Sequence, residues 1–125
     1  MTVGEAIVQV SQPRQPCWKP ARRFRLKDLA LRTQQTGRTG WYFRVLQEGY
    51  VKADTELILL DRPSSNWTIT LCNQVMHHQP HDLQLSAELA NHPHLAFSWK
   101  QTLEKRLAGA MSPPEKRLFG PNIIQ

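Results

Sequence analysis

The hydrophobic pattern of this 125-residue chain changes from a strand period to a helix period at Asp61–Asn66. Before this segment, apolar residues alternate with polar ones in short β-branched runs, and after it they recur every three or four positions. The segment itself, DRPSSN, has the composition of a linker. We therefore predict a mixed fold, with a β-rich unit containing one helix at 1–62, a small three-helix unit at 63–111 and an irregular tail at 112–125.

The first unit is predicted to contain three strands and one helix. The strands are Glu5–Val10, Gly40–Gln47 and Glu56–Leu60, and the helix is Leu26–Gln35. In the second strand, Trp41, Phe43 and Val45 share one face, which we expect to belong to the core. The continuous apolar composition of the third strand predicts burial on both faces.

A proline-rich segment, Ser11–Pro20, separates the first strand from that helix. Pro13, Pro16 and Pro20 exclude a helix and disfavour an internal strand here. We expect a stiff loop at the end of the strand, a place where functional groups are often found.

Helical patterns and capping residues define the second unit. The expected helices are Ile69–His77 after the cap Thr68, Leu83–Ala90 after the cap Asp82, and Phe97–Ala108. Pro80 and Pro93 separate the three helices. The same Pro80 lies between His77 and His81 and would break the helix that could align them on a metal, so we expect solvated or capping histidines.

Positive charge is concentrated early in the chain. The net charge is +6, and Arg14–Arg44 contains nine basic residues and one acid, Asp28. Such a density suits a phosphate-bearing cofactor, an acidic redox protein or nucleic acid, although a solvated basic face has the same composition. A nucleic-acid partner is disfavoured, because no RNP, KH or zinc motif is present.

The two cysteines lie in different settings. Cys17 follows Pro16 in the segment VSQPRQPCWK and has Arg14, Lys19, Arg22 and Arg23 within six residues. Nearby positive charge favours the thiolate, which is the nucleophilic and metal-binding form. An inert hydrophobic role is the alternative for Cys17, and a core role on the first C-terminal helix is expected for Cys72. Two cysteines are too few for a secreted disulfide scaffold, so we expect a cytoplasmic protein with reduced thiols.

The stretch VGEAIVQVSQPRQPCWK resembles the cysteine loop of the MOSC family, whose domain also forms the C-terminus of molybdenum cofactor sulfurases. The stretch TGRTGWYFRVLQEGYV is similar to stand-alone bacterial members linked to detoxification of N-hydroxylated base analogues such as 6-hydroxylaminopurine. Residues after Asn66, including Ser98–Trp99 and Lys105–Arg106, resemble the 3-alpha domain of that subgroup.

The resemblance implies a partial MOSC β-barrel and a cofactor. Cys17 matches the expected ligand of molybdenum in a molybdopterin-type cofactor and is the candidate catalytic residue. The candidates for contacts with cofactor phosphate or substrate are Gln12, Arg14, Lys19, Arg22, Arg23 and Arg38. The implied activity is reduction of small N-hydroxylated compounds, with electrons from a separate flavin or iron–sulfur partner.

Family members carry a longer N-terminal part that supplies the first half of the barrel, whereas Met1–Gly4 matches the middle of the domain. We therefore expect exposed barrel edges and a homodimer formed through them. We also expect a contribution to a reductase rather than independent activity. Membrane association is not expected. A non-catalytic carrier of the cofactor or of sulfur on Cys17 and a basic nucleic-acid-binding module are the alternatives. Binding of the cofactor without turnover would favour the carrier. Salt-dependent binding of nucleic acid that survives loss of Cys17 would favour the nucleic-acid-binding module.

Overall fold

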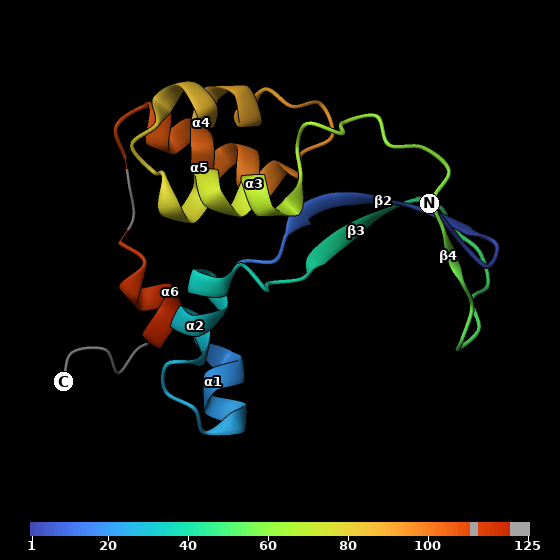
Figure 1. Ribbon diagram of the computed structural model, residues 1–125, viewed down its shortest axis with the longest axis horizontal. Helices are drawn as coiled ribbons and strands as arrows, with labels where there is room; N and C mark the ends of the chain where they lie inside the picture. Colours follow the sequence, from blue (N-terminus) through green and yellow to red (C-terminus); the bar gives the residue numbers. More distant parts are fainter. Residues whose placement is uncertain (111–112, 121–125) are drawn as a thin grey trace.

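The computed structural model describes residues 1–110 and 113–120 (Figure 1). The strands are β1 (Thr2–Val3), β2 (Ala6–Pro13), β3 (Trp41–Gln47) and β4 (Leu57–Ile58). The helices are α1 (Trp18–Phe24), α2 (Leu29–Thr36), α3 (Ile69–Asn73), the π-helical turn η1 (Gln74–His78), α4 (Leu83–Ala90), α5 (Phe97–Leu107) and α6 (Glu115–Phe119). The predicted mixed fold is confirmed.

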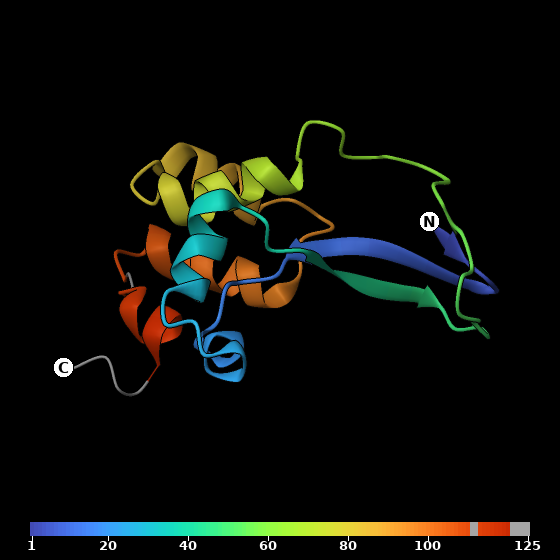
Figure 2. The same ribbon diagram turned by 60° about the horizontal axis from the view of Figure 1, so that its bottom comes forward.

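The strands form one open antiparallel sheet. Its order over the described residues is β3-β2-β1-β4, so β3 and β4 lie at the two edges. The pairing of β2 with β3 shifts register between Ile7 and Val8 and again between Val10 and Gln12. Irregularities of this kind bend and twist a β-ribbon, and the β2–β3 ribbon extends well away from the helices (Figure 2). The partial barrel expected from the sequence is therefore an open sheet.

The predicted burial of the strand residues is wrong. Trp41, Phe43 and Val45 are 49%, 41% and 59% exposed, and every residue of Leu57–Leu60 is also exposed. An alternating or continuous apolar pattern indicates only which side chains would be stabilised by burial, not whether another layer covers them. Within the described residues, no second layer covers these parts of the sheet.

The first unit contains two helices rather than one. Trp18–Pro20, predicted to be loop, forms the first turn of α1. Proline is tolerated there because its missing N–H has no partner within the helix. Arg25 ends α1 in the left-handed conformation (φ 54°), and α2 begins at Leu29.

Helices α3, α4 and α5 pack together as predicted (Figure 1). Trp99, Leu103, Leu89 and Val75 are at most 1% exposed and form the centre of this core. The predicted caps are confirmed, since Thr68 Oγ1 accepts from the Leu71 N–H (3.0 Å) and Asp82 Oδ1 from the Leu85 N–H (3.1 Å). The first helix differs from the prediction, because Gln74–His78 is π-helical.

The segment expected to be an irregular tail contains the short helix α6. Leu118 is 3% exposed, so this helix is anchored by an apolar side chain. Helix α6 packs against α1 and α2 (Figures 1 and 2). The segment Glu115–Phe119 therefore returns to the region that follows β2. Ser112 and residues 121–125 of the expected tail lie outside the described residues.

Candidate functional site

Cys17 lies directly after the long strand β2, at the N-cap position of α1. The Arg14 N–H donates to the Gly40 carbonyl (3.0 Å), so the chain remains tied to the β3 side one residue beyond β2. Pro13 and Pro16 are buried, and Cys17 is a half-buried free thiol. Two buried prolines and the sheet thus fix the direction from which the Cys17 loop leaves β2.

Arg117 of α6 joins this loop and was missed by sequence reasoning. Its Nη1 donates to the Pro16 carbonyl and its Nη2 to Gln34 Oε1, both at 2.7 Å. Burial lowers the pKa of Arg117, and the negative charge of a Cys17 thiolate raises it, which opposes that effect. The only sequence signal was the basic pair Lys116–Arg117 in the expected tail, and nothing in it indicated Cys17.

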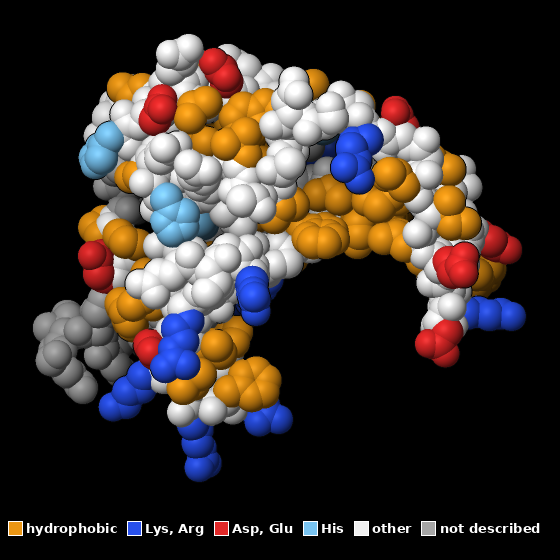
Figure 3. Space-filling model, in the orientation of Figure 1, with side chains coloured by type: hydrophobic (Ala, Val, Ile, Leu, Met, Phe, Trp, Pro, Cys, Tyr) orange, Lys and Arg blue, Asp and Glu red, His pale blue; other side chains and the backbone are white. Residues whose placement is uncertain are grey.

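The basic candidates on α1 are brought together beside Cys17. Lys19, Arg22 and Arg23 are exposed on this helix. The Arg22 guanidinium stacks on the Trp18 ring at 4.4 Å from its centroid, and Lys19 Nζ lies 6.0 Å from the same centroid. Figure 3 shows Lys and Arg side chains around the lower lobe that contains α1. Together with half-buried Arg14, these residues form a cationic surface next to the thiol.

The two remaining candidates are placed differently. Gln12 lies on β2, and its Oε1 accepts a hydrogen bond from Ser98 Oγ of α5 (2.8 Å). Arg38 is exposed in the turn between α2 and β3, and its backbone N–H donates to Thr36 Oγ1 (3.4 Å). In the described part of the chain, neither side chain has a hydrogen bond to the Cys17 loop.

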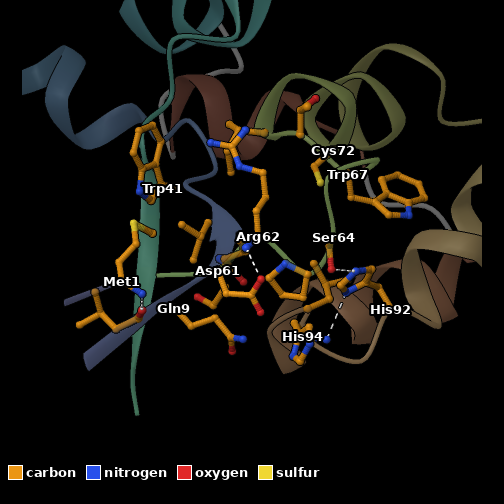
Figure 4. A pocket seen from close by; sticks show the side chains of 18 of the residues that line it. Met1, Gln9, Trp41, Asp61, Arg62, Ser64, Trp67, Cys72, His92 and His94 are labelled. Atoms are coloured by element: carbon orange, nitrogen blue, oxygen red, sulfur yellow. Dashed lines mark hydrogen bonds between the residues drawn. The ribbon is translucent and has the colours of Figure 1, made fainter. Parts of the chain in front are cut away.

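A cleft of about 610 Å³ lies between the sheet, the 59–69 segment and α3 (Figure 4). Apolar side chains dominate its walls, and its polar residues include Asp61, Arg62 and His92. It reaches Gln12 and Pro13 at the end of β2 but does not include Cys17. This cleft is a neighbour of the thiol rather than its pocket.

The polar groups of the cleft are engaged with one another. His92 Nε2 pairs with Ser64 Oγ (2.8 Å), and the His94 N–H donates to His92 Nδ1 (3.1 Å) (Figure 4). Burial, followed by the positive charges of His94 and Lys100, lowers the pKa of His92. Cys72 also lines the cleft, and burial raises the pKa of its thiol to about 11, which keeps it protonated at neutral pH. Its place in the core agrees with the prediction for Cys72.

Among residues 1–110 and 113–120, no three His, Cys, Asp or Glu side chains gather closely enough to hold a metal ion. None of the described helices is both long and apolar enough to cross a bilayer.

Comparison with known protein families finds two matches. The MOSC domain matches residues 1–58, and the YiiM-like, 3-alpha helix domain matches residues 67–110. Together these segments cover most of the chain and leave α6 outside both.

Two curated bacterial proteins match most of this chain. The protein YflK of Bacillus subtilis is 41% identical over 104 residues, which are 83% of this chain and 47% of that protein. The protein YiiM of Escherichia coli is 38% identical over 118 residues, or 94% of this chain and 52% of YiiM. The chain therefore spans about half the length of these curated relatives.

Two further matches concern structure and a larger protein. The crystal structure of YiiM from Escherichia coli superposes with a TM-score of 0.88 at 37% identity, covering 95% of this chain and 59% of that one. A protein named "Reductase" from Gibberella moniliformis is 35% identical over 89 residues, which are 71% of this chain and 16% of that protein.

Proposed function

This chain belongs to the MOSC domain family with a YiiM-like 3-alpha helix domain, and we propose that it is the cofactor-binding part of a molybdenum-dependent oxidoreductase that reduces N-hydroxylated compounds. The observation that carries the proposal is the setting of Cys17, a half-buried free thiol on a proline-bounded loop that leads into the basic helix α1. The relative named "Reductase" supports the reaction class, because its match to this chain extends over 71% of the residues.

The donor set fits a metal that brings most of its own ligands. Cys17 offers one soft thiolate donor, and no cluster of protein ligands surrounds it within the described residues. A molybdopterin-type cofactor supplies sulfur donors itself and carries phosphate. Exposed Lys19, Arg22 and Arg23 would bind that phosphate, and half-buried Arg14 would hold the end of the loop.

The chain's own residues bind and orient, whereas the bound cofactor would supply the two electrons that cleave the N–O bond. The Cys17 loop would place one thiolate at a fixed position at the end of β2. Gln12 Oε1 accepts from Ser98, and its amide NH₂ makes no hydrogen bond within the described residues, so it could donate toward cofactor or substrate. Arg38, which is exposed in the turn between α2 and β3, is proposed as a further phosphate contact. Electrons would come from a separate flavin or iron–sulfur partner.

The direct test is metal and pterin analysis of the protein purified from a host that makes the molybdenum cofactor. We expect molybdenum and pterin in stoichiometric proportion in the parent and a loss of both in Cys17→Ser, since a neutral hydroxyl is a weaker ligand than a thiolate for a soft metal centre. Cys72→Ala is the matched control, because it removes the other thiol from the core and should leave both in place. Equal metal content in the parent and in Cys17→Ser would contradict the ligand role.

A non-catalytic carrier is the second candidate function. It is favoured by the setting of Cys17, because the described residues place a free thiol there but no group of three His, Cys, Asp or Glu side chains that could also move protons. Cofactor retention combined with no reduction of any hydroxylamine substrate would assign this role. Turnover with an added flavin or iron–sulfur donor would assign the reductase.

A further inference from the structure

Helix α6 lies outside both matched domains, yet it packs on the part of the molecule that holds Cys17. The family matches end at residues 58 and 110, and α6 spans Glu115–Phe119. It packs against α1, which starts beside Cys17, and against α2 (Figures 1 and 2). The segment after the 3-alpha domain therefore meets the loop that the sequence motif identifies.

Arg117 connects two elements through one planar group. Its two hydrogen bonds, to the Pro16 carbonyl and to Gln34 Oε1, are both 2.7 Å long, the length typical of charge-assisted bonds. The Pro16 carbonyl belongs to the peptide that leads into Cys17, so fixing it restricts the orientation of the Cys17 backbone. Pro16 is buried, and its carbonyl would lose a strong donor if Arg117 were removed.

The other end of α6 approaches the residue that follows Cys17. Gly120 lies against the Trp18 indole, so closely that a Cβ at this position would fall 2.8 Å from Cδ2 of the ring. Gly120 also has φ +78°, a conformation that favours glycine. Helix α6 thus contacts both chain neighbours of Cys17, Pro16 through Arg117 and Trp18 through Gly120.

We propose that α6 is part of the Cys17 site and that Arg117 is its positioning residue, which clamps the Cys17 loop to α2 and places positive charge beside the thiol. This inference rests on the proposed function only for the role given to Cys17. The clamp and the charge are properties of the protein without cofactor, so they can be tested there.

The charge is tested by alkylating Cys17 with iodoacetate and with iodoacetamide and following the Cys17 peptide by mass spectrometry. Both reagents react with the same thiolate, so loop mobility and the thiolate fraction affect both rates equally. The ratio of the iodoacetate rate to the iodoacetamide rate therefore reports the local charge, which acts on the anionic iodoacetate. Loss of one cation at ordinary contact distance in water should lower the iodoacetate-to-iodoacetamide rate ratio about fivefold in Arg117→Met. Arg117→Lys should retain the ratio, and so should Lys116→Met, which removes an exposed cation from the same helix.

The clamp is tested by hydrogen–deuterium exchange of the peptide that contains residues 14–18. We expect exchange to rise at least about tenfold in Arg117→Met and to recover only in part in Arg117→Lys, because lysine cannot reproduce the fork that reaches both acceptors. Gln34→Leu removes one acceptor and keeps the charge, so it should raise exchange and leave the alkylation ratio unchanged. It also provides the test if Arg117→Met does not fold.

An unchanged alkylation ratio in Arg117→Met would overturn the proposal even if exchange rises, since Arg117 would then be only a structural link. Unchanged exchange in Arg117→Met, or in Gln34→Leu when that variant provides the test, would overturn it as well. Neither measurement uses the cofactor. A negative result for Arg117 in these two measurements would therefore not affect the metal analysis of Cys17→Ser. A negative result in that metal analysis would likewise not affect the conclusion about Arg117.

Discussion

At the scale of single residues, His77 is the clearest source of pH-dependent stability. Burial lowers its pKa to about 3, assisted by the positive charges of Arg117, His78 and Arg106. Its ring meets Trp99 edge to face at 6.3 Å, and its Nε2 has no hydrogen-bond partner within the described residues. The folded protein therefore holds His77 neutral, whereas the unfolded chain protonates it near its ordinary pKa of 6.5.

The unfolded state binds the extra proton between pH 6.5 and about 3, so the free energy of unfolding should fall as pH decreases through this window. The contribution of His77 is at most about 1.4 kcal/mol per pH unit. His77→Phe keeps an aromatic ring against Trp99 and should remove this slope without loss of stability at pH 7. Urea unfolding between pH 4 and 7 measures it, with the exposed His81→Gln as control. An unchanged slope in His77→Phe would show that another group dominates.

Sequence reasoning found only those residues around Cys17 that lie close to it in the chain. The prolines, the thiol and the cations Lys19 and Arg22 are adjacent in the chain, and the structure keeps them adjacent on the loop and on α1. Arg117 joins them from 100 positions away through a hydrogen bond to Pro16. Neither periodicity nor spacing encodes such a tertiary contact, so only the structure could reveal it.

At the scale of elements, the buried Arg106 stabilises the π-helical turn η1. Its guanidinium donates to the carbonyls of Val75 (3.0 Å) and Met76 (2.7 Å) and to Ser86 Oγ (3.4 Å). A π-turn shifts the helical hydrogen-bond pattern, and Arg106 of α5 binds two of its carbonyls. Burial lowers the pKa of Arg106, but a guanidinium stays charged at neutral pH.

Arg106→Met should reduce the free energy of unfolding by about 3 kcal/mol, because it leaves buried carbonyls without their charged donor. Lys105→Met, an exposed neighbour on the same helix, should change it by less than about 0.5 kcal/mol. Chemical denaturation of both variants gives the difference. Equal stabilities would mean that water replaces the guanidinium at η1.

The elements differ in how far their sequences determine them. Helices α4 and α5 were predicted almost to the residue, because periodicity and the cap Asp82 act within each helix. Helix α1 was missed because Pro20 was taken to exclude a helix, although it lies in the first turn. The π-turn at Gln74–His78 depends on Arg106, which lies about 30 positions further along the chain.

At the scale of the whole molecule, the sheet presents more apolar surface than its own helices cover. Hydrophobic side chains gather on the concave side between the helices and the sheet (Figure 3). Both faces of β3 are exposed, with Val45 at 59% and Leu46 at 56%. The strand pattern correctly indicated apolar residues, but whether a face is buried depends on what packs against it.

We propose that this surface associates with a second copy of the chain, as exposed barrel edges predict. Among the described residues, β3 has a strand neighbour on one side only, so a second β3 could add to its other side while apolar faces are buried. Val45→Lys places a charge on that edge and should weaken dimerisation at least about tenfold. Leu83→Lys is the matched control, because Leu83 is 52% exposed and lies on α4, which packs against α5 and η1. Light scattering across a concentration series measures the dissociation constant. A parent chain that remains monomeric, or a Leu83→Lys variant that dissociates equally, would show that β3 is not the interface.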